Sequence, residues 1–230
     1  YVTQGIVQMD DITENGIKYI KQDGSVGYYQ TVNKTTPVAG DVKYVDRNGD
    51  GVVDDNDRDI IGNPNPDFTY GFQTKVSWKS LSLSASFNGV QCRDILNVGN
   101  RYNNTPGTKS NNVTRKAFQN MWTDENPSNL YPKSTFVVQN MVMDRYVEDG
   151  SYLRCSDITL SYVLPAKWTN KIGIKNTSVY ASVKNAFVIT DYSGYDPEVN
   201  SFAFDGLRPG VDMNSYPTPR SFVFGLNLTF

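Results

Sequence analysis

The 230-residue sequence contains no histidine and only two cysteines. Without an imidazole side chain, Ser-His-Asp and Cys-His catalysis and the usual zinc sites are excluded. Cys92 and Cys155 can form one disulfide or remain two buried thiols, so they do not identify the redox compartment. Both fall on the polar faces of neighbouring predicted strands, where a disulfide is geometrically possible.

Long apolar runs, basic blocks and a signal segment are also absent. No run approaches the roughly 18 apolar residues of a membrane helix, which excludes a helical membrane protein. The formal net charge is -2, and without a basic block the chain is not suited to nucleic acid. Because the chain begins at Tyr1 without an initiator methionine or an apolar leader, we expect a processed chain or a fragment.

Aromatic residues, in contrast, are abundant, at 13% of the chain with 15 Tyr and 11 Phe. Such enrichment favours strands over helices. The hydrophobic content of 38% would suit a soluble protein. A transmembrane β-barrel, however, turns only alternate residues toward lipid, so a modest average does not exclude one.

Five segments alternate between apolar and polar residues, as in strands with one apolar face. In DFTYGFQTKVSW, Phe68, Phe72 and Trp78 fall on one face, while Thr69 and Lys75 fall on the other. We expect antiparallel strands over residues 67–78, 81–90, 151–164, 178–190 and 221–230.

These strands fit two kinds of protein. A soluble antiparallel sheet with one face on a core also alternates. Here the polar faces carry mainly small uncharged residues, and short turns alternate with long loops, which is typical of outer-membrane barrels. Five strands cannot close a barrel, because even small ones use about eight. We therefore expect an all-β chain: an extracellular loop region over residues 1–66, and part of a large transmembrane β-barrel over residues 67–230, with partner strands upstream.

Aromatic residues mark one end of the expected strands. Trp78, Tyr162 and Phe230 would lie outward at the short-turn end, with Trp168 in a turn nearby. Aromatic girdles of this kind lie at the membrane interfaces of transmembrane barrels.

The stretch DRNGDGVVDDND, residues 46–57, has the spacing of an EF-hand-type calcium loop. Such a loop needs oxygen ligands at positions 1, 3, 5, 7, 9 and 12, and a glycine, here Gly51, at position 6. The ligand positions hold Asp46, Asn48, Asp50, Val52 through its carbonyl, Asp54 and Asp57. Only Asp57 departs from the pattern, since it replaces Glu. The alternative is an acidic turn without metal.

Local charge favours the calcium interpretation. Residues 41–59 contain seven Asp against Lys43, Arg47 and Arg58, a net charge of -4. These carboxylates would repel one another without a cation. Pro64 and Pro66 follow the loop and prevent a regular exit helix. We therefore predict that Ca²⁺ is bound and that the loop is a structural clip.

Two other sets of residues are candidates for chemistry. Glu148 with Asp149, or Asp196 with Glu198, could serve a glycoside hydrolase. Among 24 acidic residues such pairs arise by chance, and we expect no catalysis. Aromatic residues of the long loops could instead stack on sugars or peptides, or simply hold the loops together. They are Tyr102, Trp122, Tyr131, Tyr192 and Tyr195.

Six stretches are distinctive as a set. They are GDVKYVDRNGDGVVDDNDRDIIGNPNPDFTYGF at 40–72, WTDENP at 122–127, EDGSYLR at 148–154, ITLSYVLP at 158–165, YSGYDPEV at 192–199 and YPTPRSFVFGLNLTF at 216–230. In this order they closely resemble SusC/RagA-type TonB-dependent transporters of Bacteroidota. The resemblance covers the chain from about residue 40.

The resemblance implies an outer-membrane barrel of about 22 strands with an N-terminal plug. It also implies TonB-energised import of oligosaccharides or oligopeptides, with a SusD-like surface lipoprotein as a lid. On that mapping the chain supplies the last five strands, and Phe230 matches the terminal aromatic of the assembly signal. The calcium loop then lies in an extracellular loop. The alternatives are a soluble secreted calcium-stabilised β-domain that binds carbohydrate, and a glycoside hydrolase.

Overall fold

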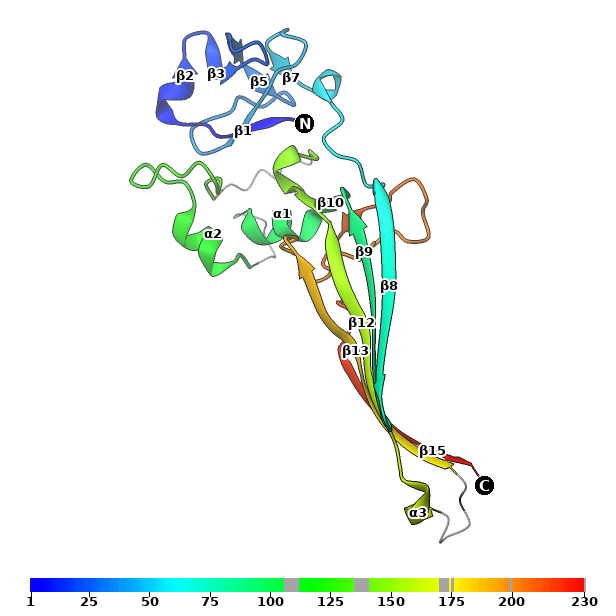
Figure 1. Cartoon of the computed structure of the whole chain (residues 1–230). Helices are drawn as coiled ribbons and strands as arrows, with labels where there is room; N and C mark the ends of the chain where they lie inside the picture. The colour runs from blue at the N-terminus through cyan, green and yellow to red at the C-terminus, as the bar shows by residue number, and fades with distance from the viewer. Residues whose placement is uncertain (106–111, 135–140, 170–173, 175, 199, 230) are drawn as a thin grey trace. The chain divides into compact units, whose positions relative to one another are not determined.

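The computed structural model describes residues 1–105, 112–134, 141–169, 174, 176–198 and 200–229 (Figure 1). They divide into two compact units. The first comprises Tyr1–Asn63, Ile95–Glu148 and Val211–Asn214, and the second comprises Pro64–Asp94, Asp149–Gly210 and Ser215–Phe230. Among the described residues, no helix is long and apolar enough to cross a membrane.

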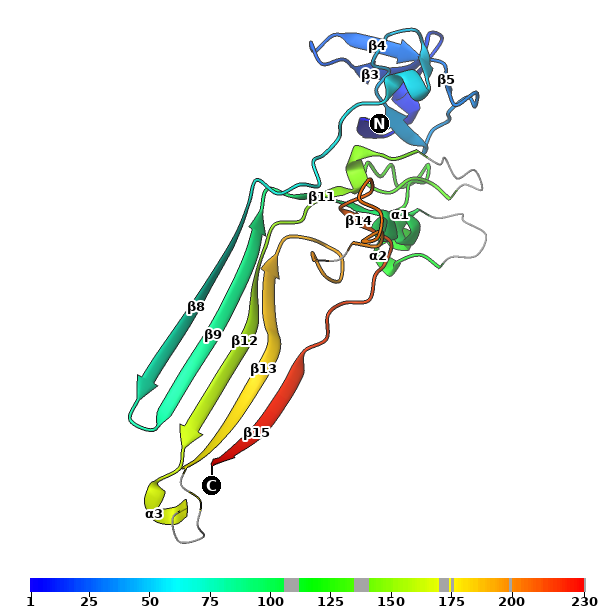
Figure 2. The ribbon, with the colours of Figure 1, turned by 90° about the vertical axis from the view of Figure 1, so that its right-hand side faces the viewer.

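The second unit is built on one five-stranded antiparallel sheet, whose strands lie side by side in Figure 2. The order is β8-β9-β12-β13-β15. The strands span Phe68–Trp78 (β8), Leu81–Gln91 (β9), Tyr152–Val163 (β12), Asn176–Thr190 (β13) and Ser221–Thr229 (β15). All five predicted strands are confirmed. A two-residue turn joins β8 to β9, and the short helix α3, Ala166–Thr169, lies in the connection between β12 and β13.

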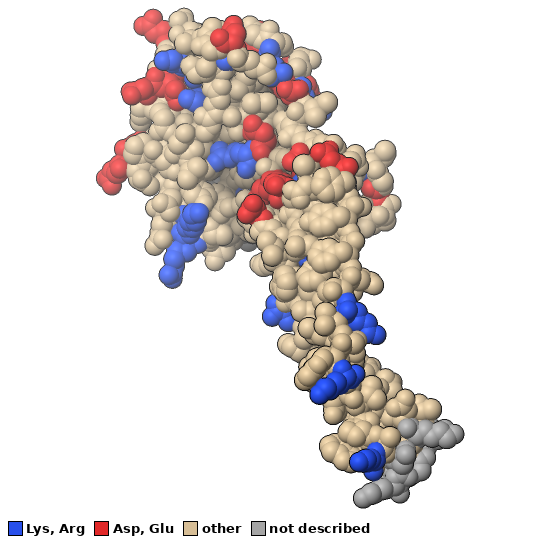
Figure 3. Space-filling model, in the orientation of Figure 1, with Lys and Arg blue, Asp and Glu red and all other residues tan. Residues whose placement is uncertain are grey.

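The apolar face of this sheet is exposed. Phe72 and Phe87 are cross-strand partners whose rings stack at 4.5 Å. Val76 and Phe224 remain 65% and 79% exposed. A sheet in a soluble sandwich would bury such a face against a second layer. The exposed face therefore favours the membrane interpretation over the soluble β-domain, and Figure 3 shows that the visible side of the sheet is covered mainly by uncharged side chains.

The opposite face carries small polar side chains that bond across strands. Ser77 Oγ lies 2.9 Å from Ser82 Oγ, and Thr159 Oγ1 lies 2.9 Å from Ser182 Oγ. These contacts satisfy hydroxyl groups without charged side chains. The two faces of the sheet thus differ as the alternation predicted.

A register shift in β12 overturns one prediction. The pairing slips between Cys155 and Asp157, so Cys155 is the cross-strand partner of Phe87 and Phe187. A bulge reverses which face the following residues occupy. Cys155 therefore shares the apolar row, and its placement on the polar face was wrong. Cys155 is buried, Cys92 is exposed and both are free, so the possible disulfide is not formed.

The predicted aromatic girdle is partly described. Trp78, Tyr162 and Trp168 are exposed, and Trp168 lies in α3. Phe230 lies outside the described residues. Lys79 places its Nζ 4.8 Å from the centre of the Trp78 ring, at the β8-β9 turn.

The first unit consists of short strands and helices. Its sheets pair β1 with β6, β2 with β3 and β4, β5 with β7, and β10 with β11 and β14. The strands are Thr3–Ile6 (β1), Ile12–Thr13 (β2), Gly16–Ile20 (β3), Val26–Tyr29 (β4), Thr31–Val32 (β5), Val42–Tyr44 (β6), Val52–Val53 (β7), Asp94–Asn97 (β10), Val147–Asp149 (β11) and Val211–Asp212 (β14). The helices are α1 (Val98–Asn104), α2 (Arg115–Asn120) and the 3₁₀ turns η1 (Met9–Asp11), η2 (Asp55–Asp57) and η3 (Asp144–Tyr146).

A core formed by distant segments holds the first unit together. Tyr1, Tyr19, Tyr44 and Met143 belong to one buried cluster. The sequence predicts an extracellular loop region over residues 1–66. In the structure, Tyr1–Asn63 form a compact unit together with Ile95–Glu148 and Val211–Asn214.

Candidate functional site

The loop 46–57 lies in the first unit and has the turn that the calcium pattern requires. Gly49 and Gly51 adopt φ of +77° and +86°. No atom lies within 4 Å of where a Cβ would be at either glycine. The backbone conformation, rather than lack of space, is therefore what favours glycine at both positions.

Side chains of the predicted ligands organise the loop backbone. Asp46 accepts hydrogen bonds from Gly49 N at 2.6 Å and from Gly51 N at 2.8 Å. Asn48 Oδ1 accepts from Asp50 N at 2.9 Å, and Asp50 Oδ1 accepts from Val52 N at 2.9 Å. These bonds wrap the first half of the loop around its own oxygen atoms.

The second half of the loop folds back onto the first. Asp57 accepts from Arg47 N at 2.7 Å with one oxygen and from Asp54 N at 2.9 Å with the other. Asp54 Oδ1 accepts from Asn56 N at 2.8 Å. The first and last ligand positions are therefore parts of one hydrogen-bonded loop.

Two of these carboxylates are buried without a basic partner. Asp46 is 3% exposed and Asp57 is 0% exposed. Among the residues that the structure describes, neither forms an ion pair. Burial raises the pKa of Asp46 above its ordinary value, against the lowering effect of the Gly51 and Gly49 amides. A buried carboxylate is costly without a cation, and oxygen donors of this kind suit calcium.

The ligand set is not gathered in the described structure. No group of three His, Cys, Asp or Glu side chains there is close enough to hold a metal ion. A calcium loop would have this order of donors, this glycine turn and these buried carboxylates. The carboxylate groups, however, are too far apart in the described structure to coordinate one ion together. Calcium binding stays a prediction.

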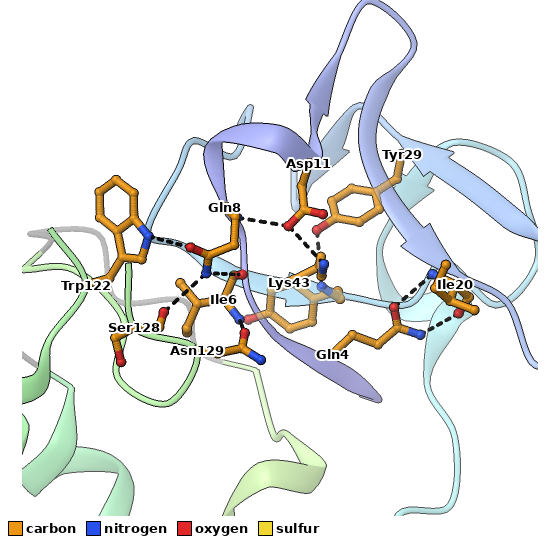
Figure 4. Close-up of polar contacts among 11 residues, drawn as sticks. Gln4, Ile6, Gln8, Asp11, Ile20, Tyr29, Lys43, Trp122, Ser128 and Asn129 are labelled. Atoms are coloured by element: carbon orange, nitrogen blue, oxygen red, sulfur yellow. Dashed lines mark hydrogen bonds and ion pairs between the residues drawn. The ribbon is translucent and has the colours of Figure 1, made fainter. Parts of the chain in front are cut away.

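Trp122, one of the predicted ligand-stacking residues, has a structural role. It is buried, and its Nε1 donates to Gln8 Oε1 at 3.1 Å (Figure 4). Gln8 Nε2 in turn donates to the carbonyls of Ile6 and Ser128, at 2.9 and 3.2 Å. Ile6 N donates to Asn129 Oδ1 at 2.9 Å. These bonds attach residues 122–129 to Ile6 and Gln8, and they leave Trp122 7% exposed.

The other predicted aromatic residues are divided between the two units. Tyr102 and Tyr131 are partly buried and belong to the first unit with Trp122. Tyr192 is buried and Tyr195 is 71% exposed, and both belong to the second unit. Of the five aromatic residues, Tyr195 is the most accessible for stacking on a ligand.

The carboxylate pairs considered for hydrolysis are engaged in structural contacts. Glu148 Oε1 accepts from Asn97 Nδ2 and Asn100 Nδ2, at 3.0 and 2.9 Å. Asp149 Oδ1 accepts from Ser151 N at 2.8 Å. The pair Asp196 and Glu198 is bound to an arginine, as described next.

Sequence reasoning missed the role of Arg154 in the second unit. Its Nη2 lies 2.5 Å from Asp196 Oδ1, and its Nε lies 2.9 Å from Glu198 Oε2. The Nε contact is an ion pair without hydrogen-bond geometry. Arg154 and Asp196 are both buried. The sequence offered one signal. Arg154 lies in EDGSYLR, and Asp196 and Glu198 lie in YSGYDPEV, and both stretches belong to the set that resembles the transporter family.

Several named proteins are similar in sequence to most of this chain. A TonB-dependent receptor of Formosa agariphila is 34% identical over 201 residues, which cover 84% of this chain and 20% of the relative. The TonB-dependent receptor SusC of Bacteroides thetaiotaomicron is 32% identical over 238 residues, covering 97% of this chain and 22% of SusC. The chain thus spans about a fifth of the length of these relatives. No family model matches the sequence.

Solved structures share the fold. The structure of the RagAB peptide transporter matches 99% of this chain with a TM-score of 0.67 and 23% identity. The RagAB peptide importer in its open-open state matches 99% of this chain with a TM-score of 0.65 and 24% identity. In each case the chain covers 22% of the RagAB chain. From the sequence relatives and the shared sheet, the chain belongs to the SusC/RagA type of TonB-dependent receptors of the outer membrane, and its long sheet is a piece of their β-barrel.

Proposed function

We propose that this chain is part of the wall and external surface of a TonB-dependent importer of oligosaccharides or oligopeptides. The observation that carries the proposal is the five-stranded sheet, with one exposed apolar face and one face of small polar side chains. In a barrel, the first face contacts lipid and the second lines an aqueous interior. The 32% identity with SusC supports the same assignment.

A SusD-like surface lipoprotein completes the importer in this proposal. The ligand is enclosed between the lipoprotein lid and the barrel, and TonB, acting on a plug outside this sequence, opens the path inward. The chain described here contributes wall, external connections and lid contacts. It contributes no catalytic group, in keeping with relatives that are named as receptors.

The two ligand classes are separated by an uptake experiment. The gene for the full-length receptor is deleted, and the strain is supplied with either a defined oligosaccharide mixture or a defined oligopeptide mixture. We expect loss of uptake for one class, restored by the wild-type gene only when TonB is active. Unchanged uptake of both mixtures would contradict the importer proposal.

A calcium ion in the loop 46–57 is a second part of the proposal. The ion would be held by Asp46, Asn48, Asp50, the Val52 carbonyl, Asp54 and Asp57. It would neutralise clustered carboxylates and fix an external loop. Supporting observations are the two left-handed glycines and the two buried carboxylates without a basic partner among the described residues.

A further inference from the structure

The side chain of Arg154 is the centre of a buried polar cluster at one end of the sheet. Arg154 lies on β12 and contacts Asp196 and Glu198, which follow β13 in the chain. Glu198 Oε1 also accepts from Tyr152 OH at 2.6 Å and from Asn88 Nδ2 at 2.9 Å. Residues of two neighbouring strands, β9 and β12, therefore hold the start of the connection that joins β13 to β15.

Asp196 also binds the far end of the same connection. Its Oδ1 accepts from Glu198 N at 3.0 Å, and its Oδ2 accepts from Thr218 N at 3.1 Å. Close to Thr218, the carbonyl of Pro219 accepts from Asn185 Nδ2 of β13 at 3.1 Å. One carboxylate thus joins the start and the end of a long connection at a single point beside the sheet.

The middle of the connection carries exposed apolar side chains, unlike its ends. Phe204 and Leu207 are 88% and 93% exposed, whereas Asp196 at the start is almost fully buried. Strand β14, Val211–Asp212, follows these exposed residues and pairs with β10. The exposed residues therefore lie between two attachments, Asp196 on one side and the β14 ladder on the other.

We propose that Arg154 and Asp196 form a clamp that holds the two ends of the connection between β13 and β15, residues 191–198 and 215–220, on the end of the sheet. Neither side chain is needed to pair the strands, because the backbone ladder already joins β9, β12 and β13. A buried ion pair costs desolvation, and removal of one partner leaves the other uncompensated. Both residues are positioning residues. The clamp rests on the sheet and the connection alone, so it holds whichever ligand class is imported.

Hydrogen exchange of the full-length receptor tests the clamp at two amides. Asp196→Asn removes the carboxylate that accepts from Glu198 N and Thr218 N. We expect the protection factors of these amides to fall by about tenfold or more, because hydrogen bonds to charged acceptors are the stronger ones. Arg154→Gln should act in the same direction. If Arg154→Gln fails to assemble, Arg154→Lys retains the charge and should show an intermediate loss.

A matched control lies on the same strand. Asp157 accepts hydrogen bonds from Thr159 and Ser182 and pairs with Lys184, all within the sheet. Asp157→Asn removes one carboxylate from β12 without touching the connection, so the amides of Glu198 and Thr218 should keep their protection. Equal protection in wild type and Asp196→Asn would overturn the clamp, as would equal losses in Asp157→Asn.

A pH profile distinguishes a charged clamp from simple packing. Burial raises the pKa of Asp196, but the Glu198 and Thr218 amides and the charge of Arg154 outweigh it and hold the pKa below 3.8. The titratable groups around Asp196 are Arg154, Glu198 and, through Glu198, Tyr152. Because the pKa of Asp196 is lowered in the folded protein, the charged carboxylate protects the Glu198 and Thr218 amides from exchange above pH 3.8. This protection is lost as the pH falls through the folded-state pKa of Asp196. The Asp196→Asn variant should lack this step, and a wild-type profile without it would overturn the clamp.

Discussion

Asp57 accepts a hydrogen bond from the backbone of Arg47 at 2.7 Å, so the last predicted calcium ligand closes the loop onto its second residue. The loop shape is thus set by its own side chains. The turn exists without calcium, whereas the ligand carboxylates are not gathered among the described residues. Calcium would therefore draw these carboxylates together and neutralise their charge.

Substitution of the loop carboxylates tests calcium binding directly. We expect isothermal titration of the full-length receptor to show a calcium site that Asp46→Ala or Asp50→Ala abolishes, since each removes an oxygen ligand. The control is Asp55→Asn, because Asp55 pairs with Arg58 outside the ligand positions. Calcium binding that survives both alanine substitutions would contradict the assignment.

The turn of this loop was predictable because its information is local. Gly51 has the left-handed φ that position 6 demands, and the predicted ligands all lie within the twelve residues 46–57. The strands β8 and β9 were predictable for the same reason, since alternation continues along their whole length. The face of β12 that Cys155 occupies was predicted wrongly. The register shift between Cys155 and Asp157 cannot be recognised from the alternation of apolar and polar residues.

The first unit was not predictable from sequence patterns. Its core joins Tyr1, Tyr44 and Met143, residues far apart in the chain, and periodicity contains no information about such contacts. Trp122 illustrates the same limit. Its aromatic type suggests stacking on ligands, yet its partner Gln8 lies 114 residues away.

The hydrogen bond between Ile6 of β1 and Asn129 predicts a sensitive glycine. Gly5 has φ of +90°, and an added Cβ would lie 2.1 Å from Asn129 Oδ1. Gly5→Ala should displace Asn129 from Ile6 N and destabilise this contact by about 1–3 kcal/mol. Hydrogen exchange at Ile6 of the full-length receptor measures the effect.

Gly24 is the matched control for that substitution. Its φ is +82°, but no atom lies within 4 Å of its Cβ position. Gly24→Ala therefore introduces only backbone strain, of about 1–2 kcal/mol, and should leave Ile6 protected. If both variants leave exchange at Ile6 unchanged, the close contact with Asn129 does not stabilise β1.

The environment of Cys92 predicts a pH-dependent reactivity. A hydrogen bond with Asp67 raises the pKa of the Cys92 thiol above its ordinary value, so less thiolate is present at neutral pH. Asp67→Asn should lower that pKa and shift the alkylation profile of Cys92 to lower pH. Iodoacetamide labelling followed by mass spectrometry measures both profiles, and coincident profiles would contradict the role of Asp67.

The central claim is that one face of the sheet contacts lipid, and two adjacent residues at the middle of β8 test it. Phe72 lies on the exposed apolar face and Gln73 on the polar face. Arginine on the lipid face costs about 2–4 kcal/mol near the membrane centre, whereas lumen positions tolerate polar change. The measurement is the yield of assembled full-length receptor in the outer membrane. We predict a strong loss for Phe72→Arg and near wild-type assembly for Gln73→Arg, and equal yields of the two variants would contradict the account.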